Sequence, residues 1–297
     1  MRSIRWRCEL EWFNRMKDAL DLMERNMEGR LDIEEIAKAA YSSPFHFQRM
    51  FQMLTGMTVA EYMRKRKLTL AAQELALSSS KVIDVSFKYG YESPEAFAKA
   101  FRKVHGISPS EARSPGVSLK AFPRISFHLS LKGDKDMDYR IVEQEAFNVI
   151  GKTIRTTCQD NQQTRDIPVL WGACHQDGTV AKLASIGKDN NVLGITLDMQ
   201  TGKDEFTYMV ASQTEADAAS LAEGLASATI LASTWVVFTS VGPAPSAIQN
   251  TFCRIYQEWF PATGYEHSGG PEMEVYLPGD VMAEDYRCEI WIPIVKK

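Results

Sequence analysis

Several signatures that would indicate an enzyme or a secreted protein are missing from this sequence. Its five cysteines are odd in number and never form a CxxC pair, which argues against a disulfide framework or a zinc site. There is no glycine-rich phosphate loop, no HExxH pair and no Ser/His/Asp signature. The most apolar stretch, residues 226–238, is too short to span a bilayer. We therefore expect a cytoplasmic protein with no metal, no cofactor, no catalytic residues and no membrane anchor.

Charge is distributed unevenly along the chain. The 297 residues are 44% hydrophobic and 24% charged, a globular composition long enough for about two domains. Residues 1–120 carry 20 Lys and Arg against 15 Asp and Glu, whereas residues 121–297 carry 14 against 23. A basic half and an acidic half are expected to have different partners.

A motif at residue 43 returns fifty residues later. The first copy contains Ser43, Pro44, Phe47, Phe51 and Gly56, and the second contains Ser93, Pro94, Phe97, Phe101 and Gly106. Each copy reads as a helix with a serine N-cap, a proline at its first position, stacked phenylalanines and a terminating glycine. A shorter helix precedes each copy, at residues 33–39 and 82–89. The sequence thus predicts two helix-turn-helix units.

A helix over residues 59–77 is expected to join the two units. Its nineteen residues span roughly 28 Å, close to the spacing of successive major grooves, about 34–36 Å. Its basic run, Arg64 to Lys67, is either a solvated face or a set of phosphate contacts.

The outward positions of the two motif helices are candidates for binding double-stranded DNA. Gln and Arg read base edges, while serine caps and helix N-termini suit phosphate oxygens. The alternative, that each helix buries one face and solvates the other, is disfavoured by two basic copies in register. The candidates are Ser43, Phe45, His46, Gln48, Arg49 and Gln52 in the first copy, and Ser93, Glu95, Ala96 and Lys99 in the second.

Residues 11–113 resemble the AraC/XylS family of bacterial transcriptional regulators. The resemblance is carried by residues 32–37 (DIEEIA), 45–51 (FHFQRMF), 85–91, 97–103 and 106–113 (GISPSEAR). It implies that Phe45, Gln48 and Arg49 read bases in one groove and Glu95, Ala96 and Lys99 in the next. Glu95 and Ala96 are poorer base readers, so less discrimination is expected from the second helix.

In the second half the residue pattern changes from helical to mainly strand-like, and we expect an α+β domain there. Strands are predicted at residues 139–154, 193–197, 206–212, 229–240, 273–277 and 287–294, and helices at 169–174, 244–260 and, as a further candidate, 216–226. The order strand–helix–strand–strand occurs twice. The predicted organisation is therefore a multi-domain chain: an all-α double helix-turn-helix domain (1–113), a linker (114–136) and an α+β domain (137–297).

The second half resembles GyrI-like effector-binding domains over about residues 138–297, in the domain order of Rob-like regulators. The motifs are Trp259-Phe-Pro, residues 271–276 and residues 289–293 (EIWIP). The resemblance implies duplicated strand–helix–strand–strand units whose cleft takes hydrophobic, often cationic, molecules.

Alternation places Glu289 with Trp291 on one face of the last strand, and Glu274 with Tyr276 on one face of an earlier strand. A carboxylate among aromatic rings suits a lipophilic cation. The alternatives are that Glu289 pairs with Arg287 on a wet surface and that the aromatics are core. The predicted effector-binding residues are Glu289, Trp291, Tyr276, Trp171, Tyr208, Trp235 and Phe238.

The sequence therefore predicts a one-component transcription regulator of the bacterial nucleoid. Its partners would be double-stranded DNA, a small-molecule effector and, as a further candidate, RNA polymerase. Two alternatives stay open for the second half: a GyrI-like hydrolase using Glu289, and a protein-interaction module.

Overall fold

The computed structural model describes residues 2–29, 31–126, 137–199, 205–214 and 224–296, with side chains described from residue 13 onward. By its contacts the chain divides into two compact units. The first comprises residues 1–44 and 58–131, and the second comprises residues 45–57 and 132–297. The segment 45–57 holds most of the first motif helix, so this helix packs as part of the unit that contains the C-terminal half.

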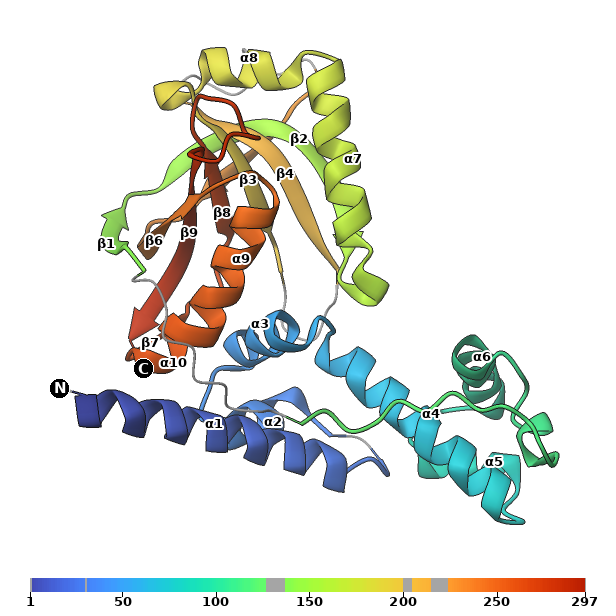
Figure 1. The fold of residues 1–297 in the computed structure, drawn as a ribbon. Helices are drawn as coiled ribbons and strands as arrows, with labels where there is room; N and C mark the ends of the chain where they lie inside the picture. Colours follow the sequence, from blue (N-terminus) through green and yellow to red (C-terminus); the bar gives the residue numbers. More distant parts are fainter. Residues whose placement is uncertain (1, 30, 127–136, 200–204, 215–223, 297) are drawn as a thin grey trace. The chain divides into compact units, whose positions relative to one another are not determined.

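Helices make up the N-terminal half, as predicted (Figure 1). They are α1 (Arg2–Arg25), α2 (Ile33–Ala39), α3 (Pro44–Thr55), α4 (Val59–Leu77), α5 (Val82–Lys88) and α6 (Pro94–His105), with a 3-10 turn at Glu111–Arg113. The expected ends of α2 and α4 match because local capping sets them. Thr58 Oγ1 accepts the Glu61 N–H at 3.1 Å, Ser93 Oγ accepts the Ala96 N–H at 3.1 Å, and Gly106 ends α6 at φ 80°.

Within the first unit, α4 supplies the centre of a core shared with α5 and α6. Leu68, Ala71 and Leu75 on α4 pack with Phe97 and Phe101 on α6. All five side chains are fully buried. Burying a large apolar side chain contributes about 1.5–3 kcal/mol. The paired phenylalanines therefore hold the second motif together, as the repeat predicted.

Where the structure describes it, the C-terminal half is a nine-stranded antiparallel sheet with helices, which confirms the predicted α+β class. Its strands are β1 (Tyr139–Gln144), β2 (Phe147–Thr157), β3 (Val192–Leu197), β4 (Glu205–Thr214), β5 (Ala226–Ile230), β6 (Ser233–Val241), β7 (Tyr265–His267), β8 (Glu272–Tyr276) and β9 (Arg287–Lys296). Its helices are α7 (Gln163–Gln176), α8 (Thr179–Ile186), α9 (Ser246–Arg254), a π-helical turn (Ile255–Trp259) and α10 (Phe260–Ala262).

The strand order β1-β6-β9-β8-β3-β4-β2-β5 displays the internal duplication. One half runs β2, α7, β3, β4 and the other runs β6, α9, β8, β9, and the two meet where β3 pairs with β8. The strand that precedes each half in the chain pairs with the other half: β1 pairs with β6, and β5 pairs with β2. The short β7 pairs with β9.

Some predicted boundaries were wrong for a topological reason. Residues 139–154 and 229–240 are not single strands, because each run breaks at two residues and its first part crosses to the opposite half. Continuous β propensity does not reveal such a crossing. Helix α8 and strand β7 were missed. The candidate helix 216–226 falls mainly on residues 215–223, and part of the linker on 127–136, both outside the described residues.

The two faces of the sheet carry different side chains, because successive residues of a strand alternate between faces. Glu272, Glu274 and Tyr208 lie on the face that α7, α8 and α9 cover. Leu193, Trp235 and their neighbours form a separate core on the other face. In the described parts of the chain, no helix is long and apolar enough to cross a bilayer.

Candidate functional site

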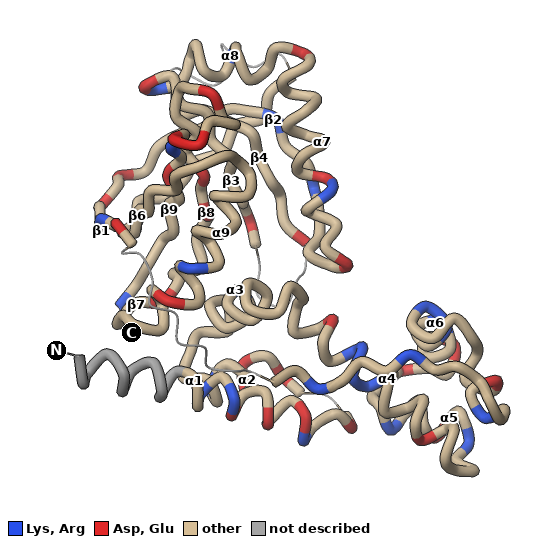
Figure 2. The backbone as a smooth tube through the Cα atoms, viewed as in Figure 1, with Lys and Arg blue, Asp and Glu red and all other residues tan. Residues whose placement is uncertain are grey.

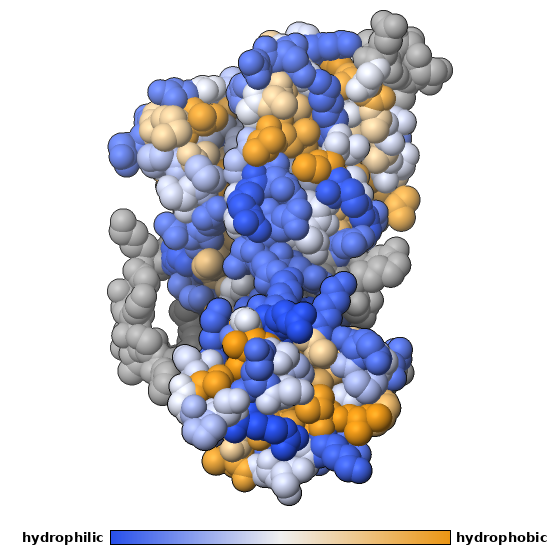
Figure 3. Space-filling model, turned by 90° about the vertical axis from the view of Figure 1, so that its right-hand side faces the viewer, coloured by the Kyte–Doolittle hydropathy of each residue, from blue (hydrophilic) through white to orange (hydrophobic). Residues whose placement is uncertain are grey.

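The outer face of α6 is open to solvent. Glu95, Ala96 and Lys99 are exposed, as are Arg102 and Lys103 further along, while Phe97 and Phe101 point into the core. Lys and Arg gather on this helix (Figure 2). The face of the molecule in Figure 3 carries both hydrophilic and hydrophobic residues. On α5, Ile83 and Phe87 are exposed. The predicted reading residues of the second motif are thus accessible, and their role stays a prediction.

The outer face of α3 is occupied instead. His46 is 1% exposed, and the side chain of Arg49 is 13% exposed. Arg49 donates from Nε to Glu272 Oε1 at 2.9 Å, and its Nη2 donates to Glu272 Oε2. The guanidinium and the β8 carboxylate therefore form a bidentate pair. Ser43, Phe45, Gln48 and Gln52 are half-buried. Two predicted DNA-reading side chains therefore contact the C-terminal half of the protein.

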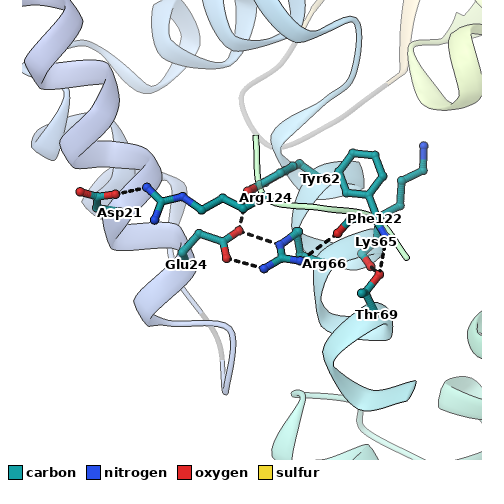
Figure 4. A network of polar contacts seen from close by, with 8 residues as sticks. All are labelled: Asp21, Glu24, Tyr62, Lys65, Arg66, Thr69, Phe122 and Arg124. Atoms are coloured by element: carbon teal, nitrogen blue, oxygen red, sulfur yellow. Dashed lines mark hydrogen bonds and ion pairs between the residues drawn. The ribbon is translucent and has the colours of Figure 1, made fainter. Parts of the chain in front are cut away.

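Three residues of the basic run of α4 pair with other groups of the protein, and a contact of this run with phosphate stays a prediction. Arg66 donates to both carboxylate oxygens of Glu24 at 2.8 and 2.7 Å and to the Phe122 carbonyl at 2.8 Å (Figure 4). Lys65 pairs with Glu61, and Lys67 donates to the Gly29 carbonyl. Arg66 thus joins α4 to α1 and to the extended chain after α6, and Lys67 joins it to the loop after α1, whereas Lys65 pairs within α4.

A carboxylate without a cationic partner lies under α7. Tyr208 and Tyr276 donate their hydroxyls to Glu274 Oε2 at 3.1 and 2.8 Å, and Trp171 Nε1 donates to the Tyr208 oxygen at 3.1 Å. The Trp171 and Tyr276 rings lie 4.7 Å apart. Among the described residues, no Lys or Arg forms an ion pair with Glu274, and no hydrogen bond reaches its Oε1. Glu274 and these three aromatic residues are called the Glu274 cluster below.

Burial raises the pKa of Glu274, and the two tyrosine hydrogen bonds only partly oppose this shift. Close packing at the carboxylate also requires a glycine on the neighbouring strand. A Cβ at Gly194 would lie 2.2 Å from the Tyr208 hydroxyl oxygen and 2.9 Å from Glu274 Oε2. By its exposed surface, Glu274 is half-buried.

Glu289, the predicted effector carboxylate, lies on the opposite face, since it is directly across from Val275. Arg140 Nη2 donates to both its oxygens at 2.9 Å, and Trp291 Nε1 donates at 3.0 Å. Its cationic partner is therefore Arg140 on β1 and not Arg287. Trp235 packs against Trp291 in that face's core, and Phe238 is buried near Tyr139 and Trp259.

Of the predicted effector residues, the structure thus gathers Tyr276, Trp171 and Tyr208 around Glu274. It places Glu289, Trp291, Trp235 and Phe238 elsewhere. For Glu274 the sequence predicts only that it shares a face with Tyr276. The spacing Glu-x-Tyr is the sequence signal for this pair. Which carboxylate, Glu274 or Glu289, lacks a cationic partner depends on Arg140, whose position is set by the long-range pairing of β1 with β6.

A duplicated helical motif whose second copy exposes a basic face, together with a duplicated sheet that holds a carboxylate–aromatic cluster, defines a DNA-binding regulator with a ligand-binding domain. Comparison with known families agrees. Residues 137–295 match the GyrI-like small molecule binding domain, and residues 36–114 match a helix-turn-helix domain. The chain belongs to the GyrI-like family and carries an AraC-type DNA-binding region.

Individual relatives match one or both parts. The HTH-type transcriptional activator AarP of Providencia stuartii is 38% identical over 95 residues, 32% of this chain and 70% of that protein. The right origin-binding protein of Escherichia coli (strain K12) is 26% identical over 287 residues, 94% of this chain and 97% of that protein. A solved structure, SAV2435 bound to tetraphenylphosphonium, is 23% identical with a TM-score of 0.48, covering 54% of this chain and 94% of that one.

Proposed function

We propose that this regulator binds a lipophilic cation at the Glu274 cluster and that α3 and α6 read its DNA site. The observation that carries the first part is the half-buried Glu274 carboxylate, which has aromatic neighbours and no ion-pair partner among the described residues. A bound cation would supply the missing charge, and the rings would add cation–π attraction of about 0.5–2 kcal/mol. Tyr276, Trp171 and Tyr208 keep their predicted roles, while Glu274 takes the place of Glu289.

Calorimetric titration of the full chain tests this assignment. Tetraphenylphosphonium and the uncharged triphenylphosphine oxide serve as matched probes. Glu274→Gln retains an acceptor for both tyrosine hydroxyls and removes only the charge, so we expect a loss of tenfold or more for the cation and little change for the neutral probe. Glu289→Gln is the control, because its carboxylate is already paired with Arg140. Equal losses for both probes would contradict an electrostatic role for Glu274.

We also propose that the chain regulates transcription without catalysing a reaction, in the cytoplasm and on the nucleoid. Its relatives named above include a transcriptional activator, and Arg140 holds the carboxylate that would have served a hydrolase. Turnover of small esters by the full chain, abolished by Glu274→Gln, would favour the hydrolase instead.

RNA polymerase is proposed as the third partner, through the helical unit. Ile83 and Phe87 on α5 are 46% and 52% exposed, which leaves an apolar surface beside the DNA-reading region. Pull-down of purified polymerase by the wild-type chain, reduced in the Phe87→Ser variant, is the expected result.

A further inference from the structure

The DNA-reading arginine of α3 is engaged by a group that offers the same pattern of acceptors as a base. A guanidinium forms two parallel hydrogen bonds with a carboxylate, and it binds the O6 and N7 atoms of guanine in the same way. Arg49 makes the first kind of pair with Glu272. While this pair persists, the donors that would read a guanine are occupied.

The contact is built by several groups of the second unit, beyond the one ion pair. Tyr256, on the π-helical turn after α9, donates its hydroxyl to Glu272 Oε1 at 2.7 Å, and its ring lies 5.7 Å from the Arg49 guanidinium. His46 Nδ1 accepts the His267 N–H at 3.2 Å, and the Phe45 and His267 rings lie 4.7 Å apart. Three predicted DNA-reading residues of α3, namely Phe45, His46 and Arg49, thus contact residues of the C-terminal half.

The electrostatics of this contact favour the charged pair. Burial on its own would raise the pKa of Glu272, but the charge of Arg49, the two hydrogen bonds from Arg49 and the His267 Nε2 atom 3.3 Å from Glu272 Oε1 hold it well below its usual range. Removing one partner of such a pair leaves the other charge buried, which is costly. In the α3 contact each of the two charges therefore has its partner.

Strand β8 links this contact to the Glu274 cluster. Glu272 and Glu274 point to the same face of β8, and residues two apart on a strand are separated by roughly 6.5–7 Å along it. Burial raises the pKa of Glu274, and the charges of Glu272 and, less strongly and in the opposite direction, of Arg49 also act on it, so the two sites lie in one electrostatic field. A cation beside Glu274 adds positive charge to that field and opposes the nearby guanidinium.

We propose that the Arg49–Glu272 contact is autoinhibitory: the C-terminal domain and DNA compete for the reading face of α3, and a lipophilic cation at the Glu274 cluster favours release of the helix. This inference rests on the proposed function. It adds that Glu272 is the residue through which the effector domain withholds the first reading helix. It also makes α6, whose outer face is open, the helix available before release.

DNA titrations with the full chain test the proposal, using a duplex enriched from random-sequence DNA by this protein. Glu272→Gln should tighten binding to this duplex on the order of tenfold, within the usual range of allosteric coupling. The matched control is Glu289→Gln, which removes the same charge from the same domain on the opposite face and should leave affinity near the wild-type value. Tyr256→Phe removes one hydroxyl from Glu272 and should give a smaller increase.

The ligand supplies a second arm of the test. Tetraphenylphosphonium should tighten DNA binding by the wild-type chain but have little further effect on Glu272→Gln, because the contact is already broken. Unchanged or weakened DNA affinity in both Glu272→Gln and Tyr256→Phe, with wild-type melting temperatures, overturns the proposal. Equal tightening by the ligand in wild type and Glu272→Gln also overturns it.

These failures can be distinguished from failure of the proposed function. Loss of specific binding in Arg49→Ala, together with charge-selective ligand binding through Glu274, would leave the proposed function intact even if Glu272→Gln had no effect. If Arg49→Ala kept its full preference for the enriched duplex, the reading role of α3 itself would fail.

Discussion

Helices α3 and α6 have the same scaffold but different surroundings. The stacked phenylalanine rings lie 6.0 Å apart in α3 and 5.5 Å apart in α6, and both helices end at a glycine with positive φ, 72° at Gly56 and 80° at Gly106. Arg49 on α3 is nevertheless paired with Glu272, whereas Lys99 on α6 is exposed. The apolar positions determine that each copy forms a helix with a buried face, and the polar positions determine which partner the outer face binds.

Breaking the shared scaffold should have the largest effect. Phe97 is fully buried in the core between α4 and α6, so Phe97→Ala should lower the free energy of unfolding of the helical unit by about 3–5 kcal/mol. Phe87→Ala, on a side chain that is 52% exposed, is the control and should change it by less than about 0.5 kcal/mol. Denaturant unfolding followed by circular dichroism measures both. Similar losses in the two variants would contradict the assigned core.

The next effect concerns the reading surface of α3. Arg49→Ala should reduce the preference for the enriched duplex over scrambled DNA by about 1–3 kcal/mol, the value of one bidentate base contact. The ratio of the two affinities is the informative quantity, because losing the Glu272 contact would change both affinities together. A mobility-shift titration with an unchanged ratio would remove Arg49 from the reading set.

The smallest effect is expected on α6. Lys99→Ala should weaken binding to both duplexes alike. It should also reduce the slope of the logarithm of the DNA-binding constant against the logarithm of the salt concentration by about one. Affinities measured at several salt concentrations test this difference from Arg49. A sequence-selective loss at Lys99 would show that the second helix discriminates as strongly as the first.

Local physics explains which features could be predicted from the sequence. Capping residues such as Asp32, Thr58 and Ser93 act within a few positions, so the helix ends and the fifty-residue duplication were readable. Alternation likewise assigned Glu274 and Tyr276 to one face. These signals need no knowledge of the tertiary fold.

The contacts on which the proposals rest are long-range. Arg49 and Glu272 are 223 positions apart, and Arg140 reaches Glu289 from 149 positions away because β1 crosses to β6. No local pattern indicates which of two similar carboxylates, Glu274 or Glu289, has a cationic partner. The sequence therefore predicted three aromatic residues that surround Glu274, but it assigned the carboxylate to Glu289.

Arginine labelling tests the central comparison most directly. Phenylglyoxal modification of the full chain, quantified by mass spectrometry, compares Arg49 on α3 with the exposed Arg102 on α6. Without DNA, Arg49 should react much more slowly than Arg102, and it should become reactive in Glu272→Gln or with tetraphenylphosphonium. Equal reaction rates for the two arginines in the wild-type chain would contradict a reading face withheld by the C-terminal domain.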